Sequence, residues 1–433
     1  RNVDQVIWGM IGEAIEDAVE KYVTSDYVAV VLAEWARANF EGVQIDPEDM
    51  RGIRKLEELE DLIKGEARNA VDSSISTELN EFMGEDREDK TGWDIKGLSS
   101  WAMSRFQVSL SQTQIKSMDS REVEEILRDK AIDQIEARNC GEIAKYLEKN
   151  YALHQLCNWA EDKFGVHVKA EEFVLDAGRQ INKPAAEIGQ LIEKRARDAY
   201  ALREIQYPVD HLLLFCFGDS GTTDNAYAGE YVRQWVMGKY GIEMTLEHIR
   251  SQSVRKLREE LCALQEEWIE DGRLEQEIDR LTSENPDEAA LVKAFNKRFY
   301  QNLTIEDLKP KLPGARGGGD RDADGSGTLT QRDVLLNRAR NFLRRELTDL
   351  EQFVLIQIFD QSWKDHLYAM DMLKQGIGLH AFAEKDPRIL YKKEGFRFFE
   401  EMMAGVRDKV TDLIFRARVQ GQTPQAQSKY KVT

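Results

Sequence analysis

The segment 322–333 carries the strongest chemical signal in the sequence, because its oxygen-bearing side chains recur at the spacing of a calcium-binding loop. Ca²⁺ prefers six to eight oxygen ligands, and the EF-hand loop supplies them from fixed positions within twelve residues. The residues at those positions are Asp322, Asp324, Ser326, Thr328 through its carbonyl, and Asp333. Asp333 is shorter than the usual Glu, and the Gly-rich residues before the loop predict no entering helix. Two interpretations stay open: a calcium site, or an acidic linker that leads into a helix capped by Thr330.

Patterns typical of catalysis are weak in the rest of the chain. No Gly-x-x-x-x-Gly-Lys-Ser/Thr motif is present to hold a nucleotide phosphate, and none of the 6 histidines forms a His-x-x-x-His pair. The stretch Gly218-Asp219-Ser220-Gly221 resembles the nucleophile turn of serine proteases, which functions only in a scaffold that also supplies His and Asp. We therefore interpret it as a loop between helices. We predict no catalytic residue and no enzyme activity in this chain alone, and no cofactor other than the calcium considered above.

The charge and the cysteine content exclude several classes of protein. With 60 Lys and Arg against 79 Asp and Glu, the 433 residues carry a net charge of −19, which argues against nucleic acid as a partner. The 4 cysteines are too scattered for a disulfide framework, so we expect small buried side chains in a reducing compartment. The longest apolar run, 211–217, is far shorter than the roughly 20 residues of a membrane span.

The periodicity of the apolar residues predicts an all-α protein with little or no sheet. The apolar pattern at 334–375 runs without Gly or Pro and predicts one continuous helix, which Gly376 and Gly378 end. A second helix is expected at 390–418. We divide the chain into a first helix (1–27), a helical region with repeats (28–310), a Gly-rich linker with the calcium-like loop (311–333), a long helix with a C-terminal hairpin (334–420) and a flexible tail (421–433).

One pattern recurs four times within 35–249 and indicates a duplicated helical module. In each copy a Trp is followed five residues later by another aromatic residue, and two apolar residues follow. The pairs are Trp35 and Phe40, Trp101 and Phe106, Trp159 and Phe164, and Trp235 and Tyr240. The spacing predicts a helix that ends at the aromatic pair, a short connection and a further helix. Because Trp buries a large apolar area, we interpret the pairs as core anchors, in modules that present an extended surface to another protein.

Residues 350–418 resemble the C-terminal helical region of the SecA family, the ATP-driven motors of bacterial preprotein export. The resemblance rests on the stretches 353–360, 363–371, 373–379, 383–387 and 391–396. The helix predicted at 3–24 is similar, more weakly, to the first part of the family's scaffold. Trp93-Asp94 resembles the start of its helical wing.

The resemblance implies a role for each part of the chain. The long helix would be the scaffold that braces the motor domains, 28–310 an expanded wing, and the hairpin the two-helix finger that reaches toward the SecYEG channel. The residues at the finger tip that would contact the moving preprotein are Leu379, His380, Phe382 and Lys385. Relatives often carry Tyr in place of Phe382 and Arg in place of His380. The segment 374–397 holds six basic and three acidic residues, so it suits an anionic membrane surface.

The same resemblance implies a cytoplasmic protein, peripheral on the inner face of the cell membrane. In the family, ATP and Mg²⁺ belong to nucleotide-binding domains that precede this region, and this sequence contains neither those domains nor the family's optional C-terminal zinc motif. We therefore expect the chain to be the C-terminal portion of a longer motor. The alternative is a free-standing helical adaptor or binding protein regulated by calcium. A continuation of the gene upstream of Arg1 with a phosphate-binding loop would favour the motor.

Overall fold

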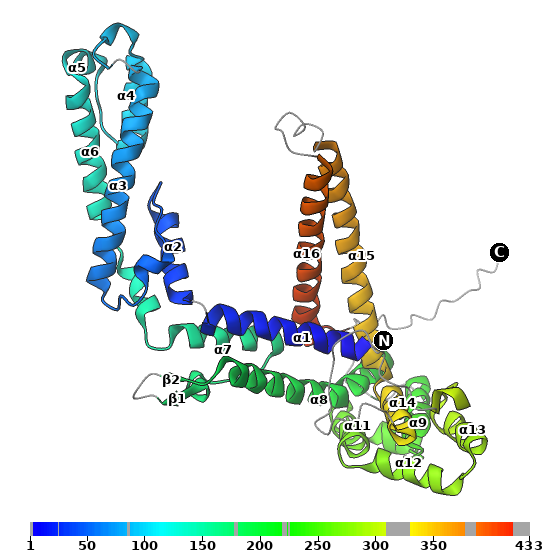
Figure 1. Cartoon of the computed structure of the whole chain (residues 1–433). Coiled ribbons are helices and arrows are strands. Elements are labelled where there is room, and N and C mark those ends of the chain that lie inside the picture. The colour runs from blue at the N-terminus through cyan, green and yellow to red at the C-terminus, as the bar shows by residue number, and fades with distance from the viewer. Residues whose placement is uncertain are drawn as a thin grey trace, which may run out of the picture. The chain divides into compact units, whose positions relative to one another are not determined.

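A computed structural model describes residues 3–24, 26–84, 87–176, 181–218, 223, 226–308, 330–376 and 387–418 (Figure 1). Helices dominate these residues, which confirms the predicted all-α class. The α-helices are α1 (Val3–Val19), α2 (Tyr27–Asn39), α3 (Leu56–Met83), α4 (Ile95–Phe106), α5 (Gln112–Ser117), α6 (Ser120–Ala137), α7 (Tyr151–Phe164), α8 (Ala185–Phe217), α9 (Ala226–Tyr240), α10 (Leu246–Ser251), α11 (Val254–Ile269), α12 (Arg273–Glu284), α13 (Glu288–Phe299), α14 (Gln331–Leu343), α15 (Arg345–Gly376) and α16 (Pro387–Ile414).

Short segments and one small sheet complete the described secondary structure. A π-helical turn, η1 (Glu20–Thr24), continues α1 directly. The 3₁₀ segments are η2 (Pro47–Met50), η3 (Lys90–Gly92), η4 (Gly141–Leu147), η5 (Ala170–Phe173) and η6 (Ile305–Leu308). The strands β1 (Val174–Asp176) and β2 (Ile181–Asn182) pair antiparallel. Within the ranges given above, no helix is long and apolar enough to cross a bilayer.

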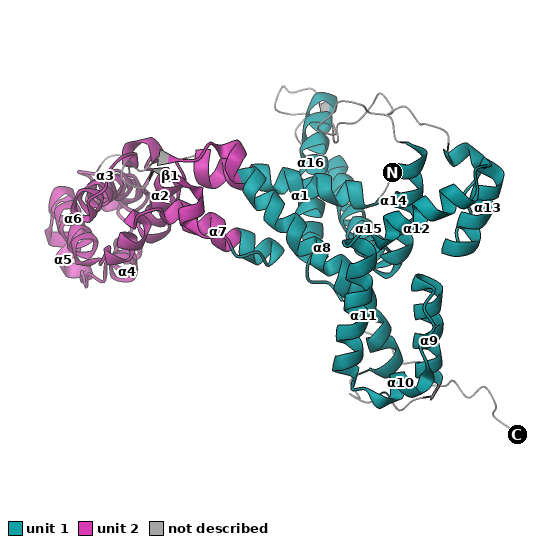
Figure 2. Ribbon diagram, turned by 90° about the horizontal axis from the view of Figure 1, so that it is seen from below, with its two compact units in different colours: residues 1–16, 160–167, 189–433 teal, residues 17–159, 168–188 magenta. Residues whose placement is uncertain are grey.

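The chain divides into two compact units (Figure 2). Unit 1 comprises residues 1–16, 160–167 and 189–433, and unit 2 comprises 17–159 and 168–188. Residues of the region 28–310 therefore occur in both units. The units follow packing density, whereas the predicted domains follow sequence resemblance, and their boundaries stay predictions.

Unit 2 is built on α3 and α6, which pack side by side (Figure 1). Leu79 of α3 and Val123 and Leu127 of α6 are completely buried within one apolar cluster. Two consecutive capping boxes start α5 and α6, where the side chains of Ser111 and Asp119 each accept a bond from the backbone N–H three residues later. These caps satisfy N–H groups that the first helical turn leaves free, so they fix where each helix begins.

All four predicted repeats are present as structural modules. In each copy a helix ends at the aromatic pair, a short helical segment follows, and a longer charged helix completes the module. The modules are α2–η2–α3, α4–α5–α6, α7–η5–α8 and α9–α10–α11. The second aromatic residue of each pair is buried: Phe40 at 5% exposure, Phe106 at 3%, Phe164 at 2% and Tyr240 at 3%. The Trp itself is half-buried in every copy, so the second aromatic residue is the deeper anchor.

The connection inside each module depends on a left-handed backbone position just after the helix. Gln107, Gly165 and Gly241 follow the aromatic residue directly and have φ of 55°, 68° and 69°. In the first copy Gly42 takes this conformation one residue later, with φ of 75°, in step with the single inserted residue there. Glycine adopts positive φ without steric cost, and this conformation turns the chain off the helix axis.

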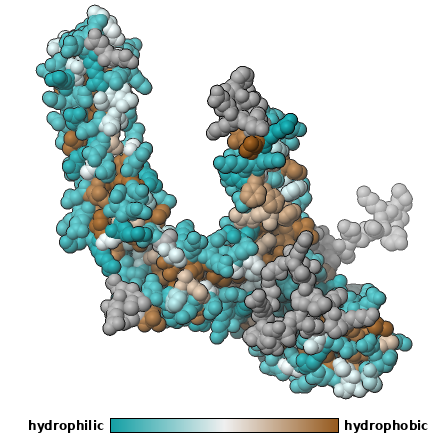
Figure 3. Space-filling model, viewed as in Figure 1, coloured by the Kyte–Doolittle hydropathy of each residue, from teal (hydrophilic) through white to brown (hydrophobic). Residues whose placement is uncertain are grey.

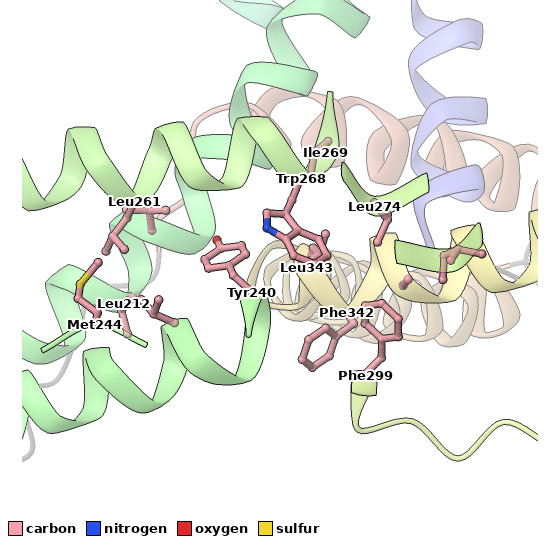
Figure 4. Close-up of a cluster of buried hydrophobic side chains, with 14 of the residues drawn as sticks. Leu212, Tyr240, Met244, Leu261, Trp268, Ile269, Leu274, Phe299, Phe342 and Leu343 are labelled. Atoms are coloured by element: carbon pink, nitrogen blue, oxygen red, sulfur yellow. The ribbon is translucent and has the colours of Figure 1, made fainter. Parts of the chain in front are cut away.

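Unit 1 contains a large apolar cluster formed by the fourth module and the helices that follow it (Figure 4). Tyr240 faces Trp268 of α11, with 6.1 Å between ring centroids. Phe299 of α13 and Phe342 of α14 meet edge to face at 6.0 Å. This cluster joins α9 and α11 to α14, so the fourth module packs against the start of the C-terminal helices.

The prediction of one continuous helix over 334–375 is wrong. The chain breaks at Arg344 into α14 and α15, and Thr330 caps the first of these. Leu347 N bonds to Arg344 O at 3.0 Å, so the carbonyl of Leu343 receives no bond from the following turn of helix. Apolar spacing cannot reveal this break, because both helices keep their apolar residues at helical spacing.

The other C-terminal expectations have mixed outcomes. α15 ends at Gly376 as predicted, whereas α16 begins at Pro387 rather than near Leu390, since proline is favoured in the first turn of a helix. The linker at 309–329 and the residues from 419 onward lie outside the described ranges. Residues 219–221 of the protease-like turn lie outside them as well.

Candidate functional site

The two arms of the C-terminal hairpin, α15 and α16, are the clearest candidate for a functional element. They run side by side over most of their length (Figure 1). A side chain at Gly395 of α16 would lie 2.9 Å from Met370 Cε of α15, which is too close for a Cβ atom. The end of the Met370 side chain therefore packs directly over Gly395, where the two arms meet. The predicted tip residues Leu379, His380, Phe382 and Lys385 lie between the arms, outside the described residues.

The base of the hairpin is buried, whereas its outer length is uncovered. Val406, Val410 and Ile414 of α16 are completely buried, together with Leu347 of α15. Farther along the arms, large apolar side chains are exposed, and apolar colour follows much of the hairpin in Figure 3. These side chains are Phe353, Ile356, Phe359, Trp363, Leu367, Tyr368, Met372, Ile389, Phe396, Phe399 and Met403. A contiguous apolar surface of this kind is typical of an interaction surface.

An aromatic row lies along these arms. Phe359 and Trp363 stack with their rings nearly parallel, 6.2 Å apart. The His366 ring lies 5.6 Å from Trp363 and meets Phe399 of the other arm edge to face at 6.0 Å. The row keeps Trp363 in a fixed orientation while 39% of its surface stays exposed.

Charged side chains on the arms neutralise one another in part. Arg397 donates to Glu394 at 2.9 Å and to Glu401 at 2.7 Å. Lys364 donates to Asp360 at 2.6 Å in the same way. These exposed pairs contribute little to stability, and Glu401 offsets part of the positive charge that was counted over 374–397.

The base of the hairpin contains a buried polar cluster around Arg344. Its guanidinium pairs with Glu351, which is completely buried, and lies 3.3 Å from Glu204 of α8. Tyr200 donates to Glu351 at 2.5 Å. Burial alone would lower the pKa of Arg344, but the carboxylates of Glu204 and Glu351 raise it above its ordinary value. Burial raises the pKa of Glu351, against the opposing effect of Arg344.

The completely buried side chain of Gln265 in α11 occupies the helix break. Its Nε2 donates to the carbonyl of Leu343 at 3.0 Å and to that of Glu204 at 3.3 Å, and its Oε1 accepts from Tyr240 at 2.5 Å. The Glu204 carbonyl needs a donor because Pro208, four residues later in α8, has no N–H to offer. One amide thus satisfies two carbonyls that two irregular helices leave free.

Lys239 completes this junction. It is 5% exposed, and its ammonium donates to the Leu343 carbonyl at 2.6 Å and to Glu346 at 2.5 Å. Trp235 donates to the same Glu346 carboxylate at 2.8 Å. Three side-chain donors, from Trp235, Lys239 and Gln265, thus converge where α14 ends and α15 begins, so side chains of the fourth module fix the direction in which α15 continues from α14.

The sequence-predicted site residues have different outcomes. Of the calcium ligands, Asp333 is described, and it forms a capping box with Thr330, accepting from Thr330 N at 2.9 Å. The cap on α14 that belonged to the linker interpretation is therefore confirmed. Asp322, Asp324, Ser326 and Thr328 lie outside the described residues, and calcium binding stays a prediction. No cluster of three or more potential metal ligands occurs among the residues that the structure places.

The aromatic anchors lie in the apolar cores of the modules. Trp35 and Trp101 pack against the two clusters of unit 2, and Trp235 packs against that of unit 1. In three copies the ring stacks edge to face on its partner or nearly so: 6.2 Å from Phe40, 5.1 Å from Phe106 and 5.6 Å from Tyr240.

Sequence reasoning missed the polar residues of the hairpin base. Lys239, Gln265 and Arg344 lie on charged helical stretches, where a polar side chain is usually solvated. A usable signal existed in the repeat itself: a polar residue stands four positions after each Trp. Of the cysteines, Cys140 is buried as expected, whereas Cys157, Cys216 and Cys262 are only half-buried, and all four thiols are free. Burial raises the pKa of the Cys216 thiol to about 12.

Comparison with known proteins identifies the C-terminal half. The family model of the SecA Wing and Scaffold domain matches residues 231–418. A SecA 1 translocase subunit of Rhodopirellula baltica is 26% identical over 434 aligned residues, which cover 95% of this chain and 33% of that protein. A SecA subunit of Clavibacter sepedonicus is 30% identical over 36% of this chain and 17% of that protein. One from Endomicrobium trichonymphae is 44% identical over 17% of this chain and 8% of that protein.

The extent of these matches matters as much as their identity. The chain spans at most about a third of the length of these curated relatives. Since the Rhodopirellula alignment covers 95% of the chain, the long repeat region is shared with that relative. No solved structure matches. The matched residues include α15 and α16 with Lys239, Gln265 and Arg344 at their base, and this part of the chain thus matches the wing and scaffold region at the C-terminal end of SecA.

Proposed function

We propose that this chain is the scaffold, wing and two-helix finger of a SecA-like motor that moves preproteins through the SecYEG channel. ATP and Mg²⁺ would bind in nucleotide-binding domains outside this sequence, and this chain would transmit their motion. The relatives are named as protein translocase subunits. The observation that carries the proposal is a hairpin with a buried, polar-locked base and an uncovered apolar length.

The hairpin combines a rigid base with an exposed outer end. A lever needs a base whose orientation is fixed, and buried hydrogen bonds to Leu343, Glu346 and Glu351 provide that here. It also needs a working end that meets its substrate. An unfolded preprotein exposes apolar side chains in no fixed order, so a nonpolar grip at Phe382 suits it better than a specific polar pocket would.

We also propose the partners and the location that follow from this role. The tip would approach the mouth of the SecYEG channel and the anionic inner surface of the cell membrane, with the protein peripheral on the cytoplasmic side. The basic residues near the tip, including Lys374, Lys392 and Lys393, favour such a surface. Calcium at 322–333 stays a separate proposal, tested below. The comparisons offer no support for the free-standing adaptor.

The decisive test is Phe382→Gly in the intact motor. Preprotein transport into vesicles should fall, because the aromatic face at the tip is lost, while basal ATP hydrolysis and the thermal unfolding midpoint stay near those of the wild type. Phe359→Gly, on the arm rather than the tip, is the comparison for a general loss of apolar surface. Undiminished transport by the Phe382 variant would contradict the finger role of this residue.

A further inference from the structure

We propose that Lys163 and Lys239, which occupy the same position in two successive repeats, are the positioning residues that hold the two ends of the hairpin. Lys239 holds the junction where α15 begins, and Lys163 holds the end of α16. The inference goes beyond the family match, which assigns no role to either residue. The anchoring itself rests on contacts in unit 1, and its consequence for transport rests on the proposed function.

The first anchor joins α9 to the start of the hairpin. Lys239 donates to one backbone carbonyl, that of Leu343, and to one carboxylate, that of Glu346, three residues farther on. The lysine is 5% exposed, so water offers its ammonium no alternative. A bond to a backbone carbonyl constrains the helix itself, and not only a flexible side chain on its surface.

The second anchor joins α7 to the end of the hairpin by the same chemistry. Lys163 is 9% exposed and donates to the carbonyl of Asp408 at 3.1 Å. It also pairs with Asp412, four residues farther on, at 2.6 Å. The contact is reinforced by the next residue, because Phe164 meets Phe415 at 5.1 Å. Each lysine thus binds one carbonyl and one carboxylate about a helical turn apart.

The equivalence of the two lysines comes from the repeat. Lys163 and Lys239 each stand four residues after the module's Trp and one residue before its buried aromatic residue. The second copy has Arg105 at this position, which donates to Glu78 of α3 at 2.9 Å. Trp101 donates to the same carboxylate, as Trp235 does to Glu346. A cation at this position therefore binds a carboxylate in the second, third and fourth copies, and in the third and fourth copies it holds the hairpin.

The first copy has no cation at this position. Its residue at this position is Asn39, a neutral side chain, whose amide oxygen accepts from Arg138 at 2.8 Å. In the third and fourth copies the residue at this position lies in unit 1 and is lysine, whereas Asn39 and Arg105 of the first two copies lie in unit 2. The ammonium of lysine has three N–H donors. It can therefore bond to a backbone carbonyl and to a carboxylate at the same time, and each end of the hairpin offers both acceptors.

The test is hydrogen–deuterium exchange on the 433-residue chain, read by peptide. Lys239→Met should speed exchange across 344–354 and leave 404–414 unchanged, and Lys163→Met should do the reverse. Each local increase should be at least about tenfold, the factor for losing one charge-assisted hydrogen bond. Arg105→Met is the matched control, since it removes the equivalent cation but should affect only peptides of unit 2.

Milder variants keep the test valid if a buried methionine prevents folding. Glu346→Gln and Asp412→Asn remove the carboxylate partner and leave the lysine in place, and each should loosen the same end as its partner's substitution, by a smaller factor. For Lys163 and Asp412, a double-mutant cycle should show that the two effects do not add, because they remove one interaction. Unchanged exchange at both ends, or a uniform increase over the whole chain, would overturn the anchoring.

Transport measured with the same substitutions in the intact motor separates the two proposals. If both the anchoring and the finger role are correct, loosening of either end should lower preprotein transport several-fold. Loosened ends with full transport would leave the anchoring intact and contradict the finger role. If hydrogen exchange at both ends of the hairpin stays unchanged and transport is full, the anchoring alone is contradicted.

Discussion

Arg344 supplies the positive charge that allows the carboxylates of Glu204 and Glu351 to stay buried at the base of the hairpin. Glu351 has no exposed surface and Glu204 is 7% exposed, and both lie within reach of this one guanidinium. A buried charge is tolerated when it is paired and hydrogen-bonded, and is costly once its partner is removed. Tyr200 and Arg340 supply further bonds to the two carboxylates, although Arg344 Nε and Glu351 Oε2 have no hydrogen-bond partner.

Replacing Arg344 with Met should therefore be strongly destabilising. The variant leaves Glu351 buried without its counter-charge, and we expect a loss of about 3–5 kcal/mol in the free energy of unfolding. Urea denaturation followed by circular dichroism would measure it. Arg345→Met, next in the chain and exposed, should cost less than about 0.5 kcal/mol. Equal effects of the two substitutions would show that Arg344 is not a buried partner.

Lys239 should give the chain a distinctive pH dependence. Burial lowers the pKa of Lys239 below its ordinary value, and Glu346 only partly opposes this shift. Between that lowered pKa and about 10.5 the unfolded chain binds more protons than the folded one, so this group makes stability rise with pH. The unfolding free energy of wild type relative to Lys239→Met should thus increase as the pH rises toward the ordinary lysine pKa of about 10.5. Burial raises the pKa of Tyr200 and of Tyr240, but these groups are present in both proteins and cancel in the difference.

The repeated module is stabilised by an aromatic pair whose two members differ in burial. Phe106 is 3% exposed, whereas Trp101 lies at the edge of the same core and donates its indole N–H to Glu78. The Trp therefore contributes both apolar contact and a polar bond that faces the surface. The same division holds for Trp235 and Tyr240.

Alanine substitutions should reveal this order. Phe40→Ala, Phe106→Ala and Phe164→Ala should each cost about 3–5 kcal/mol. Trp35→Ala and Trp101→Ala, at half-exposed positions, should cost roughly half as much, since less apolar area leaves water. Thermal unfolding of each variant would rank them. A Trp that can be removed at no cost in stability would instead be a contact for a partner.

Calcium binding by the segment 322–333, which precedes α14, can be tested directly. If 322–333 binds the ion, calcium should raise the melting temperature by mass action, and Asp322→Ala should abolish the shift. For a single loop without a paired hand we expect a dissociation constant on the order of 10⁻⁴ M. No heat on titration with millimolar calcium would leave an acidic linker that ends at the Thr330 cap.

Local rules predicted the elements well and the junctions poorly. The amphipathic first helix, the four modules and the end of α15 at Gly376 follow from spacing, capping and glycine, which act over a few residues. The break at Arg344 depends on Lys239 and Gln265, which are 105 and 79 residues away along the chain. The first-turn cap of α14 was visible in Thr330, whereas nothing local to Leu343 marks its carbonyl as the acceptor of two distant side chains.

At the scale of the whole molecule, we propose that the helices of this chain transmit motion from domains outside this sequence, and we expect no ATP hydrolysis from them. The sequence contains no phosphate-binding loop, and the described side chains hold no cluster suited to a metal. The purified 433-residue chain should therefore release phosphate from ATP only at background rate. A phosphate-release assay against buffer alone would check this, and steady turnover that survives further purification would contradict it.

The anchors of the hairpin also set the order in which the chain can finish folding as it leaves the ribosome. Arg105 finds its carboxylate at Glu78, which has already been synthesised. Lys239 must wait 107 residues for Glu346, and Lys163 must wait 245 residues for the carbonyl of Asp408. Contacts at such separations form late, because the chain must close a long loop before it gains from them. The fourth module therefore lacks the partners of Lys239 until Leu343 and Glu346 are synthesised, and the third module lacks those of Lys163 until α16 is synthesised and docks.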